Sequence, residues 1–558
     1  MAAQAPKVLV VDDDPGIAGL LADAARAAGC SASTLNDLSA FDAASLSCDV
    51  LVLDLMMPGM DGVEALRALA AAGTRARIVL ASGLEQRIID SARRVAAMQG
   101  LDVAAVLRKP FRPSEIRAAL AAALAAGLVI LATWIAAPRV VDRGDRLGGG
   151  AVVHVDGVTA VLVPFVAACL LLVFATAPRR SLQGPLATWC LAGAATTFAL
   201  FFTAHPVCIV ALACATALPV WRATRAEPGG RPAARVYAFA VGTSLCCLAA
   251  GTAMMLADPP WEPGSGWVGT AGGWLVAAAV LVRENILPFH FWVPALFAGA
   301  PLPAALLATV PQVGSYVAVR LLLGHADGVA QELVALAFLG PVTAVYGAAL
   351  AVVQRDLRRL IGYLAFSQSA LVLAGLSGTL PMELTGGLCV WLASGLSLTG
   401  IGIVAAALEG RAGPLRLDLP QGRFWDAPAL AAFFLLFGLA GIGLPGTLSF
   451  VADDLIVSGS LAEHLHGGIL VILATVFSGI AVVRGWFGIF GGPTTVDAPQ
   501  HAILPRERLG FSILLAIVFG LGLFPRPLVG TLERVSATLL RDRHPPSLPA
   551  ASPGDHPS

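Results

Sequence analysis

Charged side chains are scarce in this sequence. Asp, Glu, Lys and Arg make up 13% of its 558 residues, whereas they make up about a quarter of an ordinary soluble domain. Hydrophobic residues make up 57%, which leaves too few polar side chains to cover a water-soluble surface. The composition therefore excludes a protein that is soluble throughout, and it predicts a multi-pass membrane protein.

Lysine is almost absent, and the charges balance. The two lysines, Lys7 and Lys109, both precede residue 125, so every cation in the apolar part is Arg or His. The formal net charge is zero, which argues against a nucleic-acid binder. The nine cysteines have no CxxC or other metal-binding spacing, and no Gly-rich nucleotide loop occurs. We therefore expect no redox site in this chain.

The N-terminal segment alternates short β-branched runs with helical segments. Two of the runs end at acidic residues, Asp12 with Asp13 and Asp54, and two later runs end at Ser82 and just before Lys109. This alternation predicts a doubly wound α/β fold with a five-stranded parallel sheet. The carboxyl ends of such strands meet at one edge, where ligands bind, so these five residues are expected to lie together.

Three carboxylates at one edge of a sheet repel one another unless a cation lies among them. Oxygen ligands suit Mg²⁺, which also neutralises an incoming phosphoryl group. An aspartate at this edge can then attack that group in line, while a hydroxyl and an ammonium contact its oxygens. The pattern therefore predicts phosphorylation of an aspartate.

With these residues, the segment 1–124 resembles the receiver domain of two-component response regulators. The resemblance implies that Asp54 accepts the phosphoryl group from a histidine kinase or another phosphodonor, and that Ser82 and Lys109 contact it. It also implies Mg²⁺ as cofactor, held by Asp54 and by three further ligands: Asp12, Asp13 and the backbone carbonyl of Met56. One position departs, because Val106 stands where the family usually has Tyr or Phe, which casts doubt on switching through that aromatic side chain.

No linker separates this segment from the apolar part. The last receiver helix is expected to open at Pro113, and residues 118–137 continue from it without a charge. A span needs about 20 apolar residues, so either the receiver helix and the first span share one helix or the first span is short. The predicted domains are a receiver at 1–124, a membrane domain at 125–535 and a disordered tail at 536–558.

Apolar runs predict an all-α membrane domain of about thirteen transmembrane helices, two of them broken. They lie near residues 118–137, 155–176, 186–203, 205–222, 236–257, 268–297 (broken), 303–323, 330–353, 358–378, 385–408, 427–460 (broken), 467–490 and 508–526. Arginines are concentrated in alternate loops, and the positive-inside rule makes those loops cytoplasmic. We therefore expect a multi-pass protein of the bacterial inner membrane whose receiver lies in the cytoplasm.

An ion pair of sequence neighbours, Arg283 and Glu284, lies inside apolar sequence. A charge near the middle of a bilayer costs several kcal/mol unless it is paired or hydrated, so such residues usually mark an ion path. Pro288 and Pro294 break the helix nearby. The alternative is structural: Arg283 extends to the membrane surface, or it simply pairs with Glu284.

Five motifs give residues 150–535 a resemblance to a second family. They are Val155-Asp-Gly-Val158, Pro288-Phe-His-Phe-Trp-Val-Pro294, Gly299–Pro303 with Leu307–Pro311, Gln354–Tyr363 with Ser367-Gln368, and Gly443-Leu-Pro-Gly-Thr447. The segment resembles the antiporter-like subunits shared by respiratory NADH:quinone oxidoreductase, membrane hydrogenases and multi-subunit sodium/proton antiporters, and is nearest the N-type subunit. The resemblance implies proton translocation beside other membrane subunits.

The family's proton path is only partly present. The family has a glutamate in the span matching 205–222, which is missing here, lysines where Arg283 and Gln312 stand, and a lysine or glutamate where Asp453 stands. Arginine does not release its proton, because its pKa exceeds about 12, and glutamine does not ionise. The ion-path candidates are Arg283, Glu284, His290, Gln312, Asp356, Arg358, Asp453 and Asp454; the titratable groups best placed to carry protons are Glu284, His290, Asp453 and Asp454.

Two functions follow from these residues. The first is a non-catalytic subunit of a proton- or ion-translocating complex that a phosphorylated receiver regulates. The second is a membrane-anchored signalling protein whose transporter-like domain no longer conducts. Charges within the membrane favour the first, and the loss of the glutamate and lysines favours the second.

Overall fold

The computed structural model describes residues 7–11, 22, 31–35, 48–54, 56–57, 60–61, 70, 77–82, 103–108, 155–178, 185–260, 266–323, 330–418, 420–463, 465–492 and 503–543. The chain divides into two compact units, Met1–Ala118 and Ala119–Ser558. The predicted junction helix at 118–137 lies outside the described residues.

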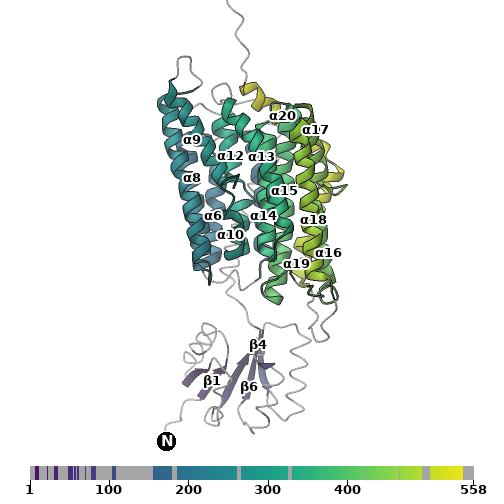
Figure 1. The fold of residues 1–558 in the computed structure, drawn as a ribbon. Coiled ribbons are helices and arrows are strands. Elements are labelled where there is room, and N and C mark those ends of the chain that lie inside the picture. The colour runs from purple at the N-terminus through teal and green to yellow at the C-terminus, as the bar shows by residue number, and fades with distance from the viewer. Residues whose placement is uncertain are drawn as a thin grey trace, which may run out of the picture. The chain divides into compact units, whose positions relative to one another are not determined.

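The first unit contains a five-stranded parallel sheet (Figure 1). Its strands are β1 (Lys7–Val11), β2 (Ser31–Leu35), β3 (Val50–Asp54), β6 (Arg77–Ser82) and β7 (Val103–Arg108), in the order β2-β1-β3-β6-β7. Two short strands, β4 (Met56–Met57) and β5 (Met60–Asp61), form an antiparallel pair. The side chains of Val10, Val11, Leu53 and Ile78 are fully buried, as expected for strands covered on both faces.

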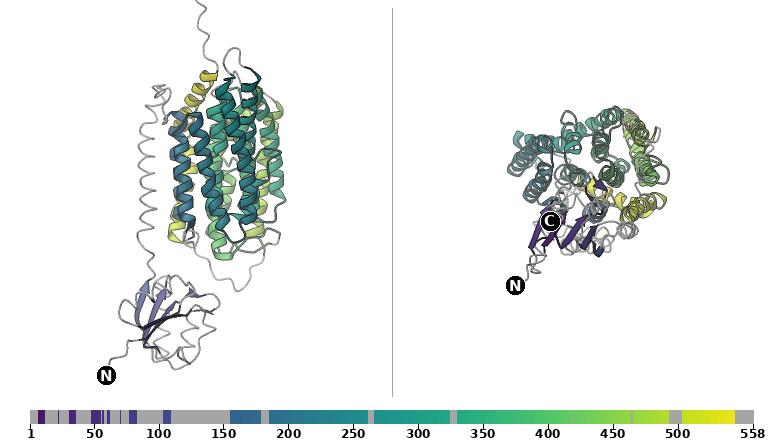
Figure 2. Two further views of the ribbon diagram at one scale, coloured as in Figure 1. Left: turned by 90° about the vertical axis from the view of Figure 1, so that its left-hand side faces the viewer. Right: turned by 90° about the horizontal axis from the view of Figure 1, so that it is seen from below.

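The second unit is a bundle of helices that run side by side (Figure 2). They are α5 (Gly157–Thr176), α6 (Pro185–Phe201), α7 (Pro206–Ala226), α8 (Arg231–Ala257), α9 (Trp267–Arg283), α10 (Trp292–Gly299), α11 (Leu302–Thr309), α12 (Val313–Val317), the π-helix η3 (Ala318–Leu322), α13 (Ala330–Val352), α14 (Leu357–Ser377), α15 (Pro381–Ala412), α16 (Pro428–Ala440), α17 (Leu448–Glu463), α18 (Leu465–Phe490), α19 (Pro505–Leu523) and α20 (Arg526–Arg543).

Eight helical segments among the described residues are long and apolar enough to cross a membrane. The number becomes nine if α19 and α20, which meet at an angle of 71°, count as one broken span. Three shorter apolar helices, within α6, α9 and α16, coincide with other predicted spans. The unit is therefore a mostly helical membrane domain, and thirteen spans stays a prediction.

Burial shows which helices lie in the middle of the bundle. The apolar windows of α14 and α15 are 89% and 94% buried, whereas those of α8 and α18 are 39% and 33% buried. The segment 302–322, which comprises α11, α12 and η3, is 94% buried. These three segments form the centre of the bundle, and any polar group on them is shielded from lipid.

The helices are interrupted at three places inside the bundle. The two predicted breaks are confirmed: residues 284–291 separate α9 from α10, and residues 441–447 separate α16 from α17. The third lies at Val310-Pro-Gln312, between α11 and α12, where the sequence predicted one continuous span. Pro311 explains it, because proline has no N–H for the helical hydrogen bond and its ring clashes with the preceding turn. Gln312 follows with a left-handed φ of 48°.

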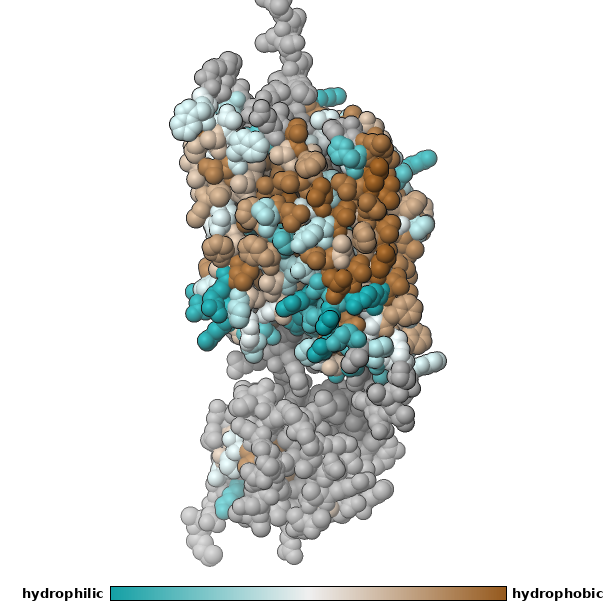
Figure 3. Space-filling view, viewed as in Figure 1, coloured by the Kyte–Doolittle hydropathy of each residue, from teal (hydrophilic) through white to brown (hydrophobic). Residues whose placement is uncertain are grey.

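Arginines mark the helix ends on one side of the bundle. They lie at the end of α7 (Arg225), the start of α8 (Arg231), the start of α14 (Arg359) and the end of α15 (Arg411). Figure 3 shows hydrophilic residues gathered below the apolar band of the bundle. Such an asymmetry is what the positive-inside rule describes for a cytoplasmic side.

One boundary of the tail needs correction. Helix α20 continues to Arg543, so residues 536–543 are helical rather than part of a disordered tail. Its apolar side chains Leu532, Val535 and Leu539 are buried, because α20 packs on α15 and α5. Residues 544–558 lie outside the described part of the chain.

Candidate functional site

Arg283 and Glu284 lie at the first break, and different helices hold their side chains. Arg283 is 9% exposed and Glu284 is 4% exposed. Nη2 of Arg283 donates to Oγ1 of Thr216 on α7 at 3.3 Å, whereas Oε1 of Glu284 accepts from the backbone N–H of Ser315 on α12 at 2.8 Å. No ion pair joins the two side chains, both of which are described. The simple pairing that served as the structural alternative is therefore wrong.

A small cavity adjoins Arg283. Its volume is about 10 Å³, and its lining includes Ser244, Arg283 and Gly314. Nη1 of Arg283 and the hydroxyl of Tyr237 are buried and have no hydrogen-bond partner among the described residues. A cavity of this size is at the limit of what one water molecule needs, and a water there would satisfy a donor that is otherwise costly to bury.

Gln312 connects the first break to the centre of the bundle. Its Oε1 accepts from Oγ of Ser315 at 3.3 Å, and its Nε2 donates to Oγ of Ser394 on α15 at 3.4 Å. These distances are long for hydrogen bonds, so the contacts are weak and easily rearranged. Polar groups therefore follow one another from Glu284 through Ser315 and Gln312 to Ser394.

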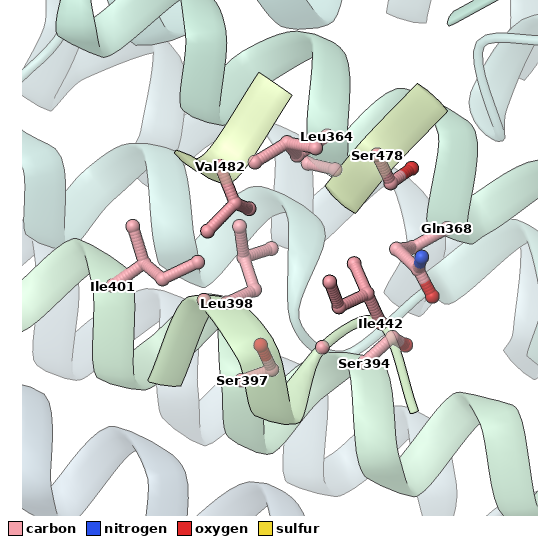
Figure 4. A pocket seen from close by; sticks show the side chains of 12 residues that line it. Leu364, Gln368, Ser394, Ser397, Leu398, Ile401, Ile442, Ser478 and Val482 are labelled. Carbon is pink, nitrogen blue, oxygen red and sulfur yellow. The ribbon is translucent and has the colours of Figure 1, made fainter. Parts of the chain in front are cut away.

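A second cavity continues from Ser394 (Figure 4). Its volume is about 20 Å³, and its polar lining comes from Gln368, Ser394, Ser397 and Ser478. Oγ of Ser478 is buried and has no partner among the described residues. One water molecule fits such a volume, and the hydroxyls and the amide around it supply the partners that it needs.

The second break lies along this cavity, and Asp453 follows it on α17. Gly441 lines the cavity, and Gly443 has a left-handed φ of 80°. A Cβ atom added at Gly443 would lie 2.6 Å from Oδ2 of Asp453, so the carboxylate of Asp453 lies directly against the backbone of the break. The neighbouring residue, Asp454, is exposed on the outside of the bundle.

These contacts define a polar row, by which we mean Glu284, Ser315, Gln312, Ser394, Ser397, Ser478, Gln368 and Asp453. Its two ends are carboxylates at the two predicted breaks, and its middle consists of neutral amides and hydroxyls. Hydroxyls both donate and accept hydrogen bonds, so together with water they can pass a proton along without being ionised themselves. The two cavities along the described residues have volumes of about 20 and 10 Å³, which suit single water molecules.

His290 lies away from the polar row. Its ring packs on Phe366, with centroids 5.9 Å apart, and edge-on to Tyr346, with centroids 5.1 Å apart. Nδ1 lies 3.2 Å from the carbonyl oxygen of Pro288. This partly exposed aromatic cluster gives His290 a packing role at the first break.

Asp356 and Arg358 lie at the arginine-rich end of the bundle. Asp356 caps α14, because its Oδ1 accepts from the N–H of Arg359 at 3.0 Å, as helix N-caps do. Arg358 forms an ion pair with Glu409 on α15 at 2.7 Å and donates to the carbonyl oxygen of Ala300 at 2.9 Å. These candidates join the ends of helices and are not part of the polar row.

Arg320 and Asp156 form a buried ion pair that the sequence patterns did not predict. Arg320 on η3 contacts Asp156 at 2.5 Å and donates through Nε to the hydroxyl of Tyr316 at 2.9 Å. That hydroxyl lies 2.9 Å from the carbonyl oxygen of Thr203. The signal was an arginine near the end of an apolar run. The contact ties α5 and α6 to the segment that carries Ser315.

In the receiver unit, two predicted positions fall at one edge of the sheet. Asp54 is the last residue of β3 and pairs with Ala81, next to Ser82, the last residue of β6. This backbone placement fits a phosphoacceptor beside a hydroxyl. Asp12, Asp13 and Lys109 follow directly after β1 and β7, but they lie outside the described residues, and the side chains of Asp54, Met56 and Ser82 are not described either.

Two family models match the chain. Residues 262–479 match the transmembrane family of the NADH:quinone oxidoreductase and Mrp antiporters, and residues 8–121 match the response regulator receiver domain. These matches confirm both resemblances seen in the sequence.

Curated relatives match the membrane part. NADH-quinone oxidoreductase subunit M of Pseudomonas aeruginosa is 29% identical over 270 residues, which are 46% of this chain and 51% of that protein. NADH-quinone oxidoreductase subunit N 2 of Solidesulfovibrio magneticus is 30% identical over 288 residues, 51% of this chain and 61% of that protein. The chain thus spans little more than half the length of these relatives, and relatives of both the M and the N type match.

Solved structures show the same fold. A chain of respiratory complex I from Thermus thermophilus superimposes with a TM-score of 0.67 at 21% identity, over 75% of this chain and 94% of that chain. A chain of the Mrp complex from Dietzia sp. gives a TM-score of 0.68 at 18% identity, over 76% and 93%.

Proposed function

We propose that this chain, which joins a response-regulator receiver domain to a membrane domain of the NADH:quinone oxidoreductase and Mrp antiporter family, conducts protons in a membrane complex under receiver control. Its named relatives are subunits of NADH-quinone oxidoreductases, so electron chemistry would belong to partner subunits. The proposed setting is the bacterial inner membrane, with the receiver in the cytoplasm beside its phosphodonor.

One observation carries the proposal: the polar row joins the two predicted breaks through the most buried part of the bundle. A non-conducting anchor has no use for such groups, because each buried polar atom without a partner costs about 1–3 kcal/mol. Ser478 has no partner in the described part of the chain, and a cavity lies beside it. The role of a membrane anchor does not explain these two costly features.

The carboxylates and the neutral groups of the polar row have different roles. Glu284 and Asp453 exchange protons at the two breaks, and the amides and hydroxyls between them orient water and hand protons on. Arg283 stays charged and does not exchange protons. Its guanidinium donates to Oγ1 of Thr216 at 3.3 Å, which holds it beside Glu284.

The receiver would supply the control. Mg²⁺ bound by Asp12, Asp13, Asp54 and the carbonyl of Met56 would neutralise the phosphoryl group that Asp54 accepts. Phosphorylation biases a two-state element only by its differential contacts, typically a few kcal/mol, which is enough to shift a balanced gate.

The test uses the complex purified with this chain and reconstituted into liposomes, with proton movement followed by a pH-sensitive dye. Asp453→Asn is expected to abolish movement, and Asp454→Asn is the matched control, because that neighbour is exposed outside the bundle. Arg283→Lys changes movement less and can raise it, since lysine can release a proton. If Asp453→Asn conducts as the parent does, the polar row is not the path.

One observation favours the second function, a signalling protein whose membrane domain does not conduct. Gln312, in the middle of the polar row, cannot ionise where the family has lysine. A signalling protein with a non-conducting membrane domain would show no proton movement in the parent, while binding of its partner subunits would still depend on phosphorylation of Asp54.

A further inference from the structure

A buried carboxylate outside the polar row lies on the first turn of α15. Glu383 is 7% exposed, and its Oε1 accepts a hydrogen bond from Oγ of Ser460 on α17 at 2.6 Å. A carboxylate is costly to bury within a membrane helix, and those that persist usually serve an ion or proton path. Nothing in the polar row accounts for it.

Glycines allow α15 and α17 to pack tightly against the carboxylate of Glu383. A Cβ atom at Gly459 of α17 would lie 2.8 Å from Cβ of Glu383, and one at Gly378, just before α15, would collide with the carboxylate itself. Two residues further along α15, where α20 packs on it, Oγ1 of Thr385 donates to Oγ of Ser536 at 3.0 Å. Glu383 therefore occupies a formed site near the end of the bundle where α15 begins, opposite Arg411 in the last turn of that helix.

The geometry of α17 aligns this site with Asp453. Ser460 follows Asp453 by seven residues, which in an α-helix is about 10 Å along the axis and only about 20° around it. The two side chains thus lie on one face of α17, with Asp453 at the break and Ser460 at Glu383. A proton leaving the polar row along this face arrives at Glu383.

An apolar block separates the two acids. Ile456, on the turn between Asp453 and Ser460, is fully buried. A Cβ atom at Gly375 of α14 would lie 3.0 Å from its Cδ1, and one at Gly386 of α15 would lie 2.7 Å from its N, so the block is tightly packed on both sides. Water must enter transiently before a proton can cross, which is how a gate prevents backward leakage.

We propose that Glu383 is the outlet group of the proton path, and that Ile456 is the gate between it and Asp453. In each transfer one proton leaves a carboxyl oxygen of Asp453, crosses by water and binds a carboxylate oxygen of Glu383, from which it leaves at the end of the bundle where α15 begins. No other bond changes. The inference rests on the proposed proton-conducting function.

The test compares four forms of the reconstituted complex: the parent, Glu383→Gln, Glu383→Asp and Thr385→Val. Glutamine keeps the size and the hydrogen bond to Ser460 but cannot exchange protons, so proton movement is expected to fall by about tenfold or more. Aspartate restores part of it. Thr385→Val, on the same turn but without a titratable group, conducts as the parent does and shows that this helix end tolerates substitution.

The outcomes separate the two proposals. If Asp453→Asn stops proton movement and Glu383→Gln does not, the polar row stands and Glu383 is not its outlet. If the parent moves no protons, both proposals fail. Infrared difference spectra of the full chain after a pH jump give a second measurement that does not depend on transport: a carboxyl band that Glu383→Gln removes is expected, and its absence from the parent overturns the assignment.

Discussion

Removing the carboxylate of Asp156 is expected to destabilise the membrane domain by about 3–5 kcal/mol. Its oxygens accept from Nη1 and Nη2 of Arg320 at 2.5 and 3.0 Å, and Oδ1 also accepts from the N–H of Thr159 in the first turn of α5. Asp156→Ala removes this N-cap, worth about 1 kcal/mol. It also leaves a guanidinium that is only 8% exposed without its counter-charge, and this second effect is the larger one.

Asp156→Asn separates the two contributions. Asparagine is as good an N-cap as aspartate and still accepts hydrogen bonds from Arg320, but it carries no charge. Unfolding of the full chain in detergent, followed by tryptophan fluorescence, is expected to rank the parent above Asp156→Asn and Asp156→Ala last. If Asp156→Ala lies within about 1 kcal/mol of the parent, the ion pair does not stabilise the bundle as a buried pair does.

The same substitution also tests how the polar row is held in place. Arg320 contacts Tyr316, the residue after Ser315, whose N–H binds Glu284. Loss of the ion pair is therefore expected to loosen α12 and to lower proton movement more in Asp156→Ala than in Asp156→Asn. Equal movement in both variants would mean that α12 is positioned by its other contacts alone.

Three more predictions concern the receiver, the second break, and the junction between the receiver and the membrane domain. The full chain is expected to incorporate acid-labile phosphate from acetyl phosphate, and both removal of Mg²⁺ with EDTA and Asp54→Ala to abolish this; incorporation by Asp54→Ala equal to the parent would exclude that residue. Gly443→Ala is expected to cost about 1–2 kcal/mol for its left-handed backbone and to lower proton movement by displacing Asp453, with Gly520→Ala, where a Cβ atom meets nothing within 4 Å, as the control. A Gly-Ser spacer of about six residues after Gly127 is expected to remove the dependence of proton movement on Asp54 phosphorylation while phosphorylation itself persists; if the dependence survives, the receiver acts through the cytoplasmic loops.

Sequence patterns predicted the ends of the polar row and Gln312 in its middle, but not its serines. Arg283, Glu284 and Asp453 stand out because charges are rare in apolar sequence. Single serines such as Ser394 and Ser478 do not stand out, because a serine in a helix usually binds its own backbone. Only packing decides that these hydroxyls face one cavity.

Helix breaks were predictable to a similar extent. Gly and Pro clusters gave the breaks at 284–291 and 441–447, whereas the single Pro311 did not suggest one, since transmembrane helices tolerate isolated prolines. Asp356 and Arg358 look like path residues in a linear sequence. Their partners at the helix ends, such as Glu409, are distant in the chain, so their structural role appears only in the fold.

Because the middle of the polar row is neutral, the receiver needs less free energy to open or close it. A path built on buried lysines must move charge through the centre of the bundle, and burying an unpaired charge costs several kcal/mol. In the polar row the centre carries no resident charge, so closing it requires only that Gln312 exclude one or two water molecules. Moving a two-state gate from 1% to 99% open takes about 5.5 kcal/mol, whereas a gate that is already near balance responds to the few kcal/mol that phosphorylation of Asp54 can supply. Weak contacts of 3.3 and 3.4 Å at Gln312 are consistent with such a balance, because little is lost when they rearrange.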